Sequence, residues 1–256
     1  MTTIDRDGVA LFYDDVGSGA PPLVMLHCWG GDHRYLAPQT EYFRHRHRVI
    51  SPDLRGFGAS ARPRQAYTMA GYADDVAWLC DQLALERPVL IGHSMGGTIA
   101  LTAAARDPDR YAAIVILEAL VVAPPGMVDA FRPVLDGVRS PAWADTMRNV
   151  TDLLTGPHFD PRDRERMRAH MVTNDPHVLA SSQEDLLAQD TAALAARCTV
   201  PVLYVASPTW YTDVARFRAL CPQLQTAQLV GCGHNFPLEV PAQTNAVIDR
   251  FLRLLP

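Results

Sequence analysis

A serine in a glycine-flanked turn is the first residue of the chain that can act as a nucleophile. Ser94 stands at the centre of the pentapeptide G-H-S-M-G at 92–96, between the apolar run 89–91 and a helix-compatible run at 97–106. A strand, a sharp turn and a helix around G-x-S-x-G predict a nucleophile elbow, which pushes the serine hydroxyl out of a strained turn. The glycines leave room for that turn, and the start of the helix favours negative charge beside Ser94.

A histidine near the end of the chain is the predicted base. His234 lies in a glycine-flanked turn after a predicted strand at 226–230. Chains with this elbow carry serine, acid and histidine in that order, which assigns the base to His234.

Two carboxylates are candidates for the acid. Asp213 begins a predicted helix, away from the position at which an aspartate is usual, whereas Glu118 ends the apolar strand 113–117. We favour Glu118, because a carboxylate at the end of so apolar a strand faces the histidine loop and can accept the Nδ1 proton of the base.

The loop after the predicted strand 23–26 supplies the second half of an oxyanion hole in this arrangement. We therefore predict that the backbone N–H groups of Trp29 and Met95 bind an oxygen that gains charge during the reaction. The substrate pocket is expected to include residues beside these motifs and two tryptophans: His27, Cys28, His93, Leu120, Trp143 and Trp210.

Alternating strands and helices predict the α/β class with a mostly parallel sheet. Together with the elbow they predict an α/β-hydrolase fold: eight strands, helices on both faces, and a helical cap inserted after the sixth strand. Residues 121–195 are helical runs broken by prolines and rich in charges, so we assign them to the cap, and 1–120 and 196–256 to the core. The segment 9–16 is expected to be an antiparallel edge strand.

Composition excludes several classes of protein. The chain has 256 residues and a net charge of −5 with no long basic run, which argues against nucleic acid and anionic membrane partners. Five cysteines without a C-x-x-C pair predict reduced thiols. With no apolar leader and no membrane-length run, we expect a cytoplasmic protein. No ligand cluster or cofactor motif is present, so no metal and no cofactor are predicted. Oligomeric state leaves no signal in the sequence.

Four further segments mark one branch of this fold. They are W-G-G-D-H-R at 29–34, the acid-x-Leu segment E-A-L at 118–120, S-P-T at 207–209, and the histidine loop 234–241. This set resembles the cofactor-independent 2,4-dioxygenases of 3-hydroxy-4(1H)-quinolones, which include enzymes that open 2-alkyl-3-hydroxy-4-quinolone signals. Three residues depart from the branch: Cys28 replaces Gly, Glu118 replaces Asp, and Met95 replaces a histidine.

The resemblance implies a specific reaction on a small apolar aromatic substrate and O₂. His234 with Glu118 would remove the 3-hydroxyl proton, while Ser94 would only orient the substrate. The resulting anion would react with O₂, the ring would open, carbon monoxide would leave and an N-acylanthranilate would remain. The protein would supply base catalysis and a preorganised dry pocket.

The same residues support a second reaction. G-H-S-M-G-G at 92–97 is the common elbow of esterases. The alternative function is therefore a serine hydrolase, a carboxylesterase or lactonase, in which Ser94 attacks a small apolar ester and forms an acyl-enzyme. A non-catalytic receptor is a third possibility, which an intact serine, histidine and acid disfavours.

Overall fold

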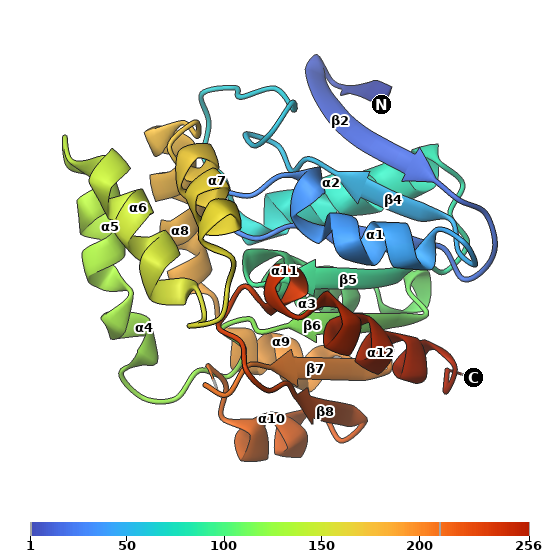
Figure 1. Ribbon diagram of the computed structural model, residues 1–256. Coiled ribbons are helices and arrows are strands. Elements are labelled where there is room, and N and C mark those ends of the chain that lie inside the picture. The colour runs from blue at the N-terminus through green and yellow to red at the C-terminus, as the bar shows by residue number, and fades with distance from the viewer. Residues whose placement is uncertain (1, 210, 256) are drawn as a thin grey trace.

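The computed structural model describes residues 2–209 and 211–255, and an eight-stranded sheet runs through their centre (Figure 1). The strands lie in the order β1-β2-β4-β3-β5-β6-β7-β8. β2 pairs antiparallel with β1 and β4, and the other pairs are parallel, as predicted. The strands are β1 (Thr2–Arg6), β2 (Val9–Val16), β3 (Leu23–Leu26), β4 (Val49–Pro52), β5 (Val89–His93), β6 (Ala113–Leu117), β7 (Val202–Ala206) and β8 (Leu224–Gln228).

The edge of the sheet differs from the expectation. β2 is antiparallel as predicted, but β1 precedes it and takes the edge position. β1 is short, polar and mostly exposed, so it lacks the apolar alternation by which a half-buried strand is found in a sequence.

Helices cover both faces of the sheet. α2, α3, α9 and α10 pack in series on one face, and α1, α11 and α12 pack together on the other. These helices are α1 (Ala37–Phe43), α2 (Met69–Gln82), α3 (Met95–Arg106), α9 (Thr191–Arg197), α10 (Val214–Leu220), α11 (Phe236–Glu239) and α12 (Pro241–Leu252), with short 3₁₀ turns η1 (His33–Leu36) and η2 (Pro108–Arg110).

Alternate side chains of the central strands pack against the helices on opposite faces of the sheet. On β6, Ile114 and Ile116 join the cluster that contains α2 and α3, while Ala113, Val115 and Leu117 join the cluster beneath α1 and α12. All five are fully buried. A strand that is buried on both faces consists of a continuous run of apolar residues, and this pattern allowed β5 and β6 to be predicted from the sequence.

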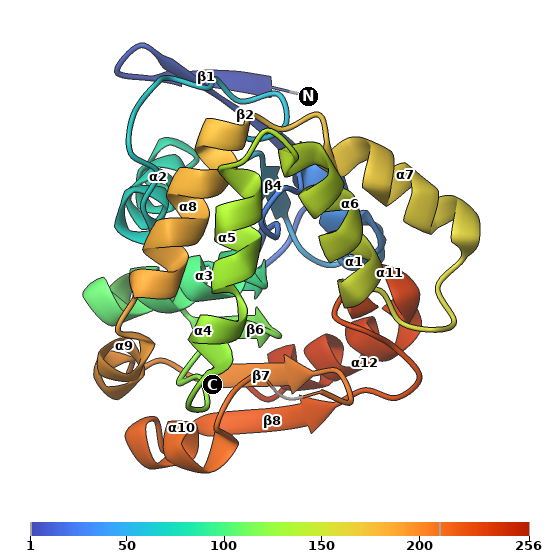
Figure 2. The same cartoon turned by 90° about the vertical axis from the view of Figure 1, so that its left-hand side faces the viewer.

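Five helices gather at the end of the sheet toward which β5 and β7 point (Figures 1 and 2). They are α4 (Met127–Ala130), α5 (Arg132–Val138), α6 (Trp143–Leu154), α7 (Pro161–Met171) and α8 (Pro176–Ala188). α9 packs instead against α3 and α10 in the core layer. The predicted boundary at 195 therefore falls inside a core helix, because α9 continues the helical pattern of the cap without a break in composition.

In the part of the chain that the structure describes, every helix is too short or too polar to cross a membrane. All five cysteines are buried, and none of them forms a disulfide bond.

Candidate active site

Ser94 occupies the turn between β5 and α3 with φ 54° and ψ −119°. A non-glycine residue holds such a conformation only where its surroundings enforce it. A Cβ atom at Gly92 would lie 2.1 Å from the carbonyl oxygen of Gly96, and one at Gly96 would lie 2.2 Å from that of Leu26. Both positions require glycine so that the elbow can sit tightly between β5, β3 and the start of α3.

His234 and Glu118 come together although 116 positions separate them. The imidazole Nδ1 donates to Glu118 Oε2 at 2.8 Å, since a carboxylate only accepts. Glu118 is 1% exposed, and its other oxygen accepts the backbone N–H of Ser207 at 2.6 Å. The hydrogen bond fixes the His234 tautomer with Nε2 unprotonated, so the ring is set to accept a proton.

The competing acid lies elsewhere. Asp213 is the N-cap of α10, and its carboxylate accepts the backbone N–H of Arg216 at 3.0 Å. It thus satisfies one of the free donors at the start of that helix, which is a structural role.

His93 was expected in the pocket, but it lies behind His234. Its Nε2 donates to the backbone carbonyl of His234 at 2.9 Å, and the two ring centroids are 4.6 Å apart. Tyr35 stacks on its other side at 5.1 Å. Complete burial holds the pKa of His93 well below its ordinary value, so the ring is neutral. His93 therefore supports the backbone of His234, and it is not in the lining of either cavity described below.

A cavity lies between the elbow and the cap. We call it the Thr98 cavity. Its polar wall consists of Ser94, Thr98, Glu118, Gln183, Tyr211 and His234. Its apolar wall includes Leu120, Phe131, Val134, Val150, Leu154 and Leu186. Ser94 and His234 thus share a cavity with many apolar side chains, and binding sites for small molecules commonly have this character.

A second cavity, which we call the Cys28 cavity, adjoins the same two residues. Ser94 and His234 line it too, together with Cys28, Tyr35, Met167 and Met171. A substrate bound across Ser94 can therefore place one part in each cavity. Within the described residues, neither lining includes an arginine or a lysine.

Three of the six predicted pocket residues do not line either cavity. Besides His93, these are His27 and Trp143. His27 is 1% exposed, and its ring bridges two backbone groups, with Nδ1 on the carbonyl of Cys28 and Nε2 on the N–H of Leu54. Trp143 packs partly buried against the main apolar cluster at the far end of α6.

Two of the predicted pocket residues line a cavity, and one lies outside the described residues. Leu120 lines the Thr98 cavity and Cys28 lines the second cavity. Trp210 lies outside the described residues.

Trp29 and Met95, the predicted oxyanion donors, both line the Thr98 cavity. The Trp29 indole donates to the backbone carbonyl of Leu179 in α8, which fixes the loop against the cap. Met95 begins α3, so its backbone N–H has no acceptor within the helix. Both amides are thus on elements held in place beside Ser94.

The ring of Tyr211 meets the ring of His234 edge-on at 5.5 Å. Burial raises the pKa of Tyr211 to about 12, so its hydroxyl stays neutral in the cavity. No sequence signal pointed to Tyr211, Thr98 or Gln183, since Tyr211 reaches the site from the loop between β7 and α10, Thr98 from α3 and Gln183 from α8.

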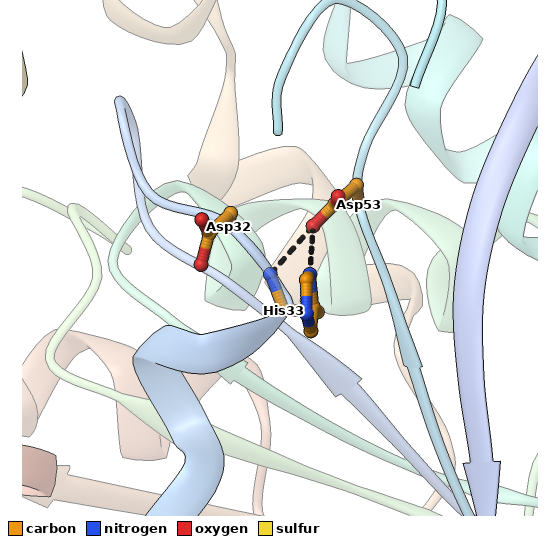
Figure 3. A group of neighbouring side chains, drawn as sticks. All are labelled: Asp32, His33 and Asp53. Atoms are coloured by element: carbon orange, nitrogen blue, oxygen red, sulfur yellow. Dashed lines mark hydrogen bonds and ion pairs between the residues drawn. The ribbon is translucent and has the colours of Figure 1, made fainter. Parts of the chain in front are cut away.

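Asp32, His33 and Asp53 form a compact cluster beside the site, which we call the Asp32 cluster (Figure 3). Asp53 accepts the His33 backbone N–H at 2.6 Å, its Nδ1 at 2.8 Å and the Ala59 backbone N–H at 2.7 Å. Asp32 caps η1 and pairs with the Arg34 guanidinium. Protein donors thus occupy the carboxylates, and the cluster joins the loops after β3 and β4.

The Asp32 cluster also explains part of the sequence pattern. D-H-R at 32–34 supplies two of its members, Asp32 and His33, so these residues brace a loop. Of the run 29–34, Trp29 alone is in the lining of the Thr98 cavity among the described residues.

Comparison with known proteins places the chain in a family. A model described as the alpha/beta hydrolase fold matches residues 21–241. The AB hydrolase superfamily protein YisY of Bacillus subtilis is 41% identical over 102 residues, which span 40% of this chain and 38% of that protein. The 3-oxoadipate enol-lactonase 2 of Acinetobacter baylyi is 25% identical over 258 residues, 98% of this chain and 96% of that protein.

A solved structure is similar over the whole length. A thermophilic esterase from Thermogutta terrifontis superposes with a TM-score of 0.85 and 27% identity, covering 99% of this chain and 97% of that one. The sheet order, the elbow and the family match agree, and this chain belongs to the alpha/beta hydrolase fold family.

Proposed function

We propose that this protein is a serine hydrolase that cleaves a neutral carboxylic ester or lactone. Ser94 is the nucleophile, His234 the general base and Glu118 the residue that orients it. One observation carries the proposal: a serine in a strained turn at the start of α3 shares a cavity with an imidazole whose Nδ1 is bonded to a buried carboxylate.

The reaction follows from the positions of these groups. Ser94 Oγ attacks the ester carbonyl carbon while its proton passes to Nε2 of His234. The carbonyl oxygen becomes an oxyanion and accepts hydrogen bonds from the backbone N–H groups of Trp29 and Met95. The proton on His234 then passes to the leaving alcohol, and an acyl-enzyme remains. Water, activated by the same imidazole, releases the acid.

In the structure without substrate, the hydrogen bond between the nucleophile and the base is not yet formed. Among the described residues no hydrogen bond joins Ser94 Oγ to His234 Nε2, whose ring is held through Nδ1. Such bonds are often long in unliganded enzymes and tighten when substrate binds.

The residues that line the two cavities favour a substrate without a net charge. A free carboxylate on the substrate would be buried among apolar side chains with no arginine or lysine in either lining. Burying an unpaired charge is costly, so an uncharged ester or lactone fits this site better than a dicarboxylate. The names of similar proteins, an esterase and an enol-lactonase, support hydrolysis of this bond type.

The quinolone 2,4-dioxygenase activity is a second candidate. It is favoured by Glu118 directly after β6 in place of an acid after β7, together with the W-x-x-D-H-R run. Against it stands the bracing role of 32–34, since those residues contribute to the loop and not to the cavity lining.

Two substrates separate the candidates. The protein is assayed on p-nitrophenyl hexanoate, and on a 2-alkyl-3-hydroxy-4-quinolone with oxygen uptake and carbon monoxide recorded. A hydrolase is inactivated by Ser94→Ala and by His234→Ala alike, and a fluorophosphonate labels Ser94. A dioxygenase loses only about two- to hundredfold on Ser94→Ala, because one hydrogen bond is removed, and far more on His234→Ala. Oxygen uptake with that asymmetric pair, and no ester cleavage, would refute the hydrolase.

A further inference from the structure

Two polar side chains in the wall of the Thr98 cavity have no hydrogen-bond partner among the residues that the structure describes. Thr98 on α3 is 0% exposed, and its Oγ1 makes no hydrogen bond. Gln183 on α8 is 4% exposed, and among the described residues nothing bonds to its side-chain amide. Leaving a buried polar group unsatisfied is unfavourable, and such groups in native proteins ordinarily have a reason.

On both helices, a neighbouring hydroxyl group donates a hydrogen bond to a backbone carbonyl one turn earlier in its own helix. One turn further along α3, the Thr102 hydroxyl donates to the backbone carbonyl of Thr98 at 2.8 Å. Beside Gln183 on α8, the Ser182 hydroxyl donates to the carbonyl of Val178 at 2.7 Å. Thr98 has the same option toward the carbonyl of Ser94 and does not take it, so its hydroxyl is left for what enters the cavity.

One hydrogen-bond acceptor on the substrate can satisfy both groups. The Thr98 hydroxyl and the Gln183 NH₂ are both donors, and a carbonyl oxygen accepts two hydrogen bonds. The surrounding wall is apolar, including Leu120, Val150 and Leu186, and it offers no cation for a carboxylate. The matching substrate group is therefore a neutral ketone or amide carbonyl on an otherwise apolar chain.

The position along α3 sets the distance from the reacting carbon. Thr98 follows Ser94 by four residues, which is about 6 Å along a helix axis at 1.5 Å per residue. Roughly four or five covalent bonds span that length. We propose that Thr98 and Gln183 form a specificity subsite for an acyl chain carrying a keto or amide oxygen about four carbons beyond the ester carbonyl.

This inference rests on the proposed hydrolase function and is tested with two esters of equal chain length. They are p-nitrophenyl 5-oxohexanoate and p-nitrophenyl hexanoate, compared by the ratio of their kcat/KM values. The unmodified protein is expected to prefer the oxo ester. Thr98→Val and Gln183→Leu each lower the ratio about two- to tenfold, the worth of one neutral hydrogen bond, and the double variant lowers it further.

Matched controls exclude general effects of the substitutions. Thr102→Val removes a hydroxyl from the same helix and Ser182→Ala removes one from α8, and both hydroxyls are already bonded within their helices. Neither control is expected to change the ratio. A ratio that stays constant in Thr98→Val and Gln183→Leu, or a preference for the plain ester in the unmodified protein, would overturn the subsite.

Binding separates failure of the subsite from failure of the hydrolase. Both esters are titrated calorimetrically into the Ser94→Ala variant, with and without Thr98→Val. Tighter binding of the oxo ester that Thr98→Val abolishes supports the subsite even where no ester is cleaved, in which case only the hydrolase function falls. Equal binding of the two esters refutes the subsite whether or not hydrolysis occurs.

Discussion

Replacing Glu118 with glutamine tests the central hydrogen bond of the site. The change keeps the size of the side chain and an oxygen for the Ser207 N–H, but removes the charge 2.8 Å from His234 Nδ1. Losing a charge-assisted hydrogen bond costs about 1.5–3 kcal/mol, or about 10- to 150-fold in rate. The glutamine NH₂ also favours the wrong imidazole tautomer, which brings the expected loss in kcat to about 10³- to 10⁴-fold.

The assay is kcat on p-nitrophenyl hexanoate, with the melting temperature recorded for each variant. Asp213→Ala is the control, because Asp213 was the other candidate acid and caps α10. It is expected to cost about 1 kcal/mol of stability and to leave kcat unchanged. The reasoning is refuted if Glu118→Gln stays within tenfold of the unmodified protein, or if Asp213→Ala is the variant that loses turnover.

Three further predictions concern stability. Burial lowers the pKa values of His27 and His93 from 6.5, so below about pH 6.5 the unfolded chain binds protons that the folded chain does not. Each histidine then removes about 1.4 kcal/mol per pH unit, and the fall in Tm from pH 7 to 5 should be shallower in His93→Gln. Gly92→Ala should abolish folding or cost more than about 3 kcal/mol, whereas Gly126→Ala, which meets open space, should cost about 1, both by denaturant titration. EDTA should leave Tm and kcat unchanged, because protein donors occupy the Asp32 cluster; a chelator-induced loss would assign it a metal.

Local physics made the elbow predictable. Around Ser94 the fold is dictated within ten residues, by an apolar strand, two glycines without which backbone atoms collide, and a helix start. Glu118 was found by a similar argument, since a charge at the end of an apolar strand needs a partner.

Closeness in sequence to a motif did not by itself place a side chain in a cavity. His93 ends β5 and its ring stacks on Tyr35, whereas Ser94 lies in the turn after that strand and lines the cavity. Trp143 shares α6 with the cavity residue Val150 but lies about 10 Å along the axis from it. Gln183 went unnoticed because its place depends on how α8 packs over the core, which no local pattern encodes.

The motif W-x-x-D-H-R shows that residues shared with another family can stabilise the same loop without indicating the same reaction. Its aspartate caps η1, and its histidine bonds Asp53 from the next loop. These contacts hold the loop from which Trp29 lines the cavity, and the proposed oxyanion role of its N–H is one that a hydrolase and an oxygenase would share. What distinguishes the two reactions is whether Ser94 forms a bond to the substrate or only orients it. In our proposal that choice depends on the wall facing Ser94, where Thr98 and Gln183 stand among apolar side chains in a cavity whose described lining has no arginine or lysine. Substrate chemistry in this protein is therefore to be sought in α3 and α8, not in the run 32–34 that suggested it.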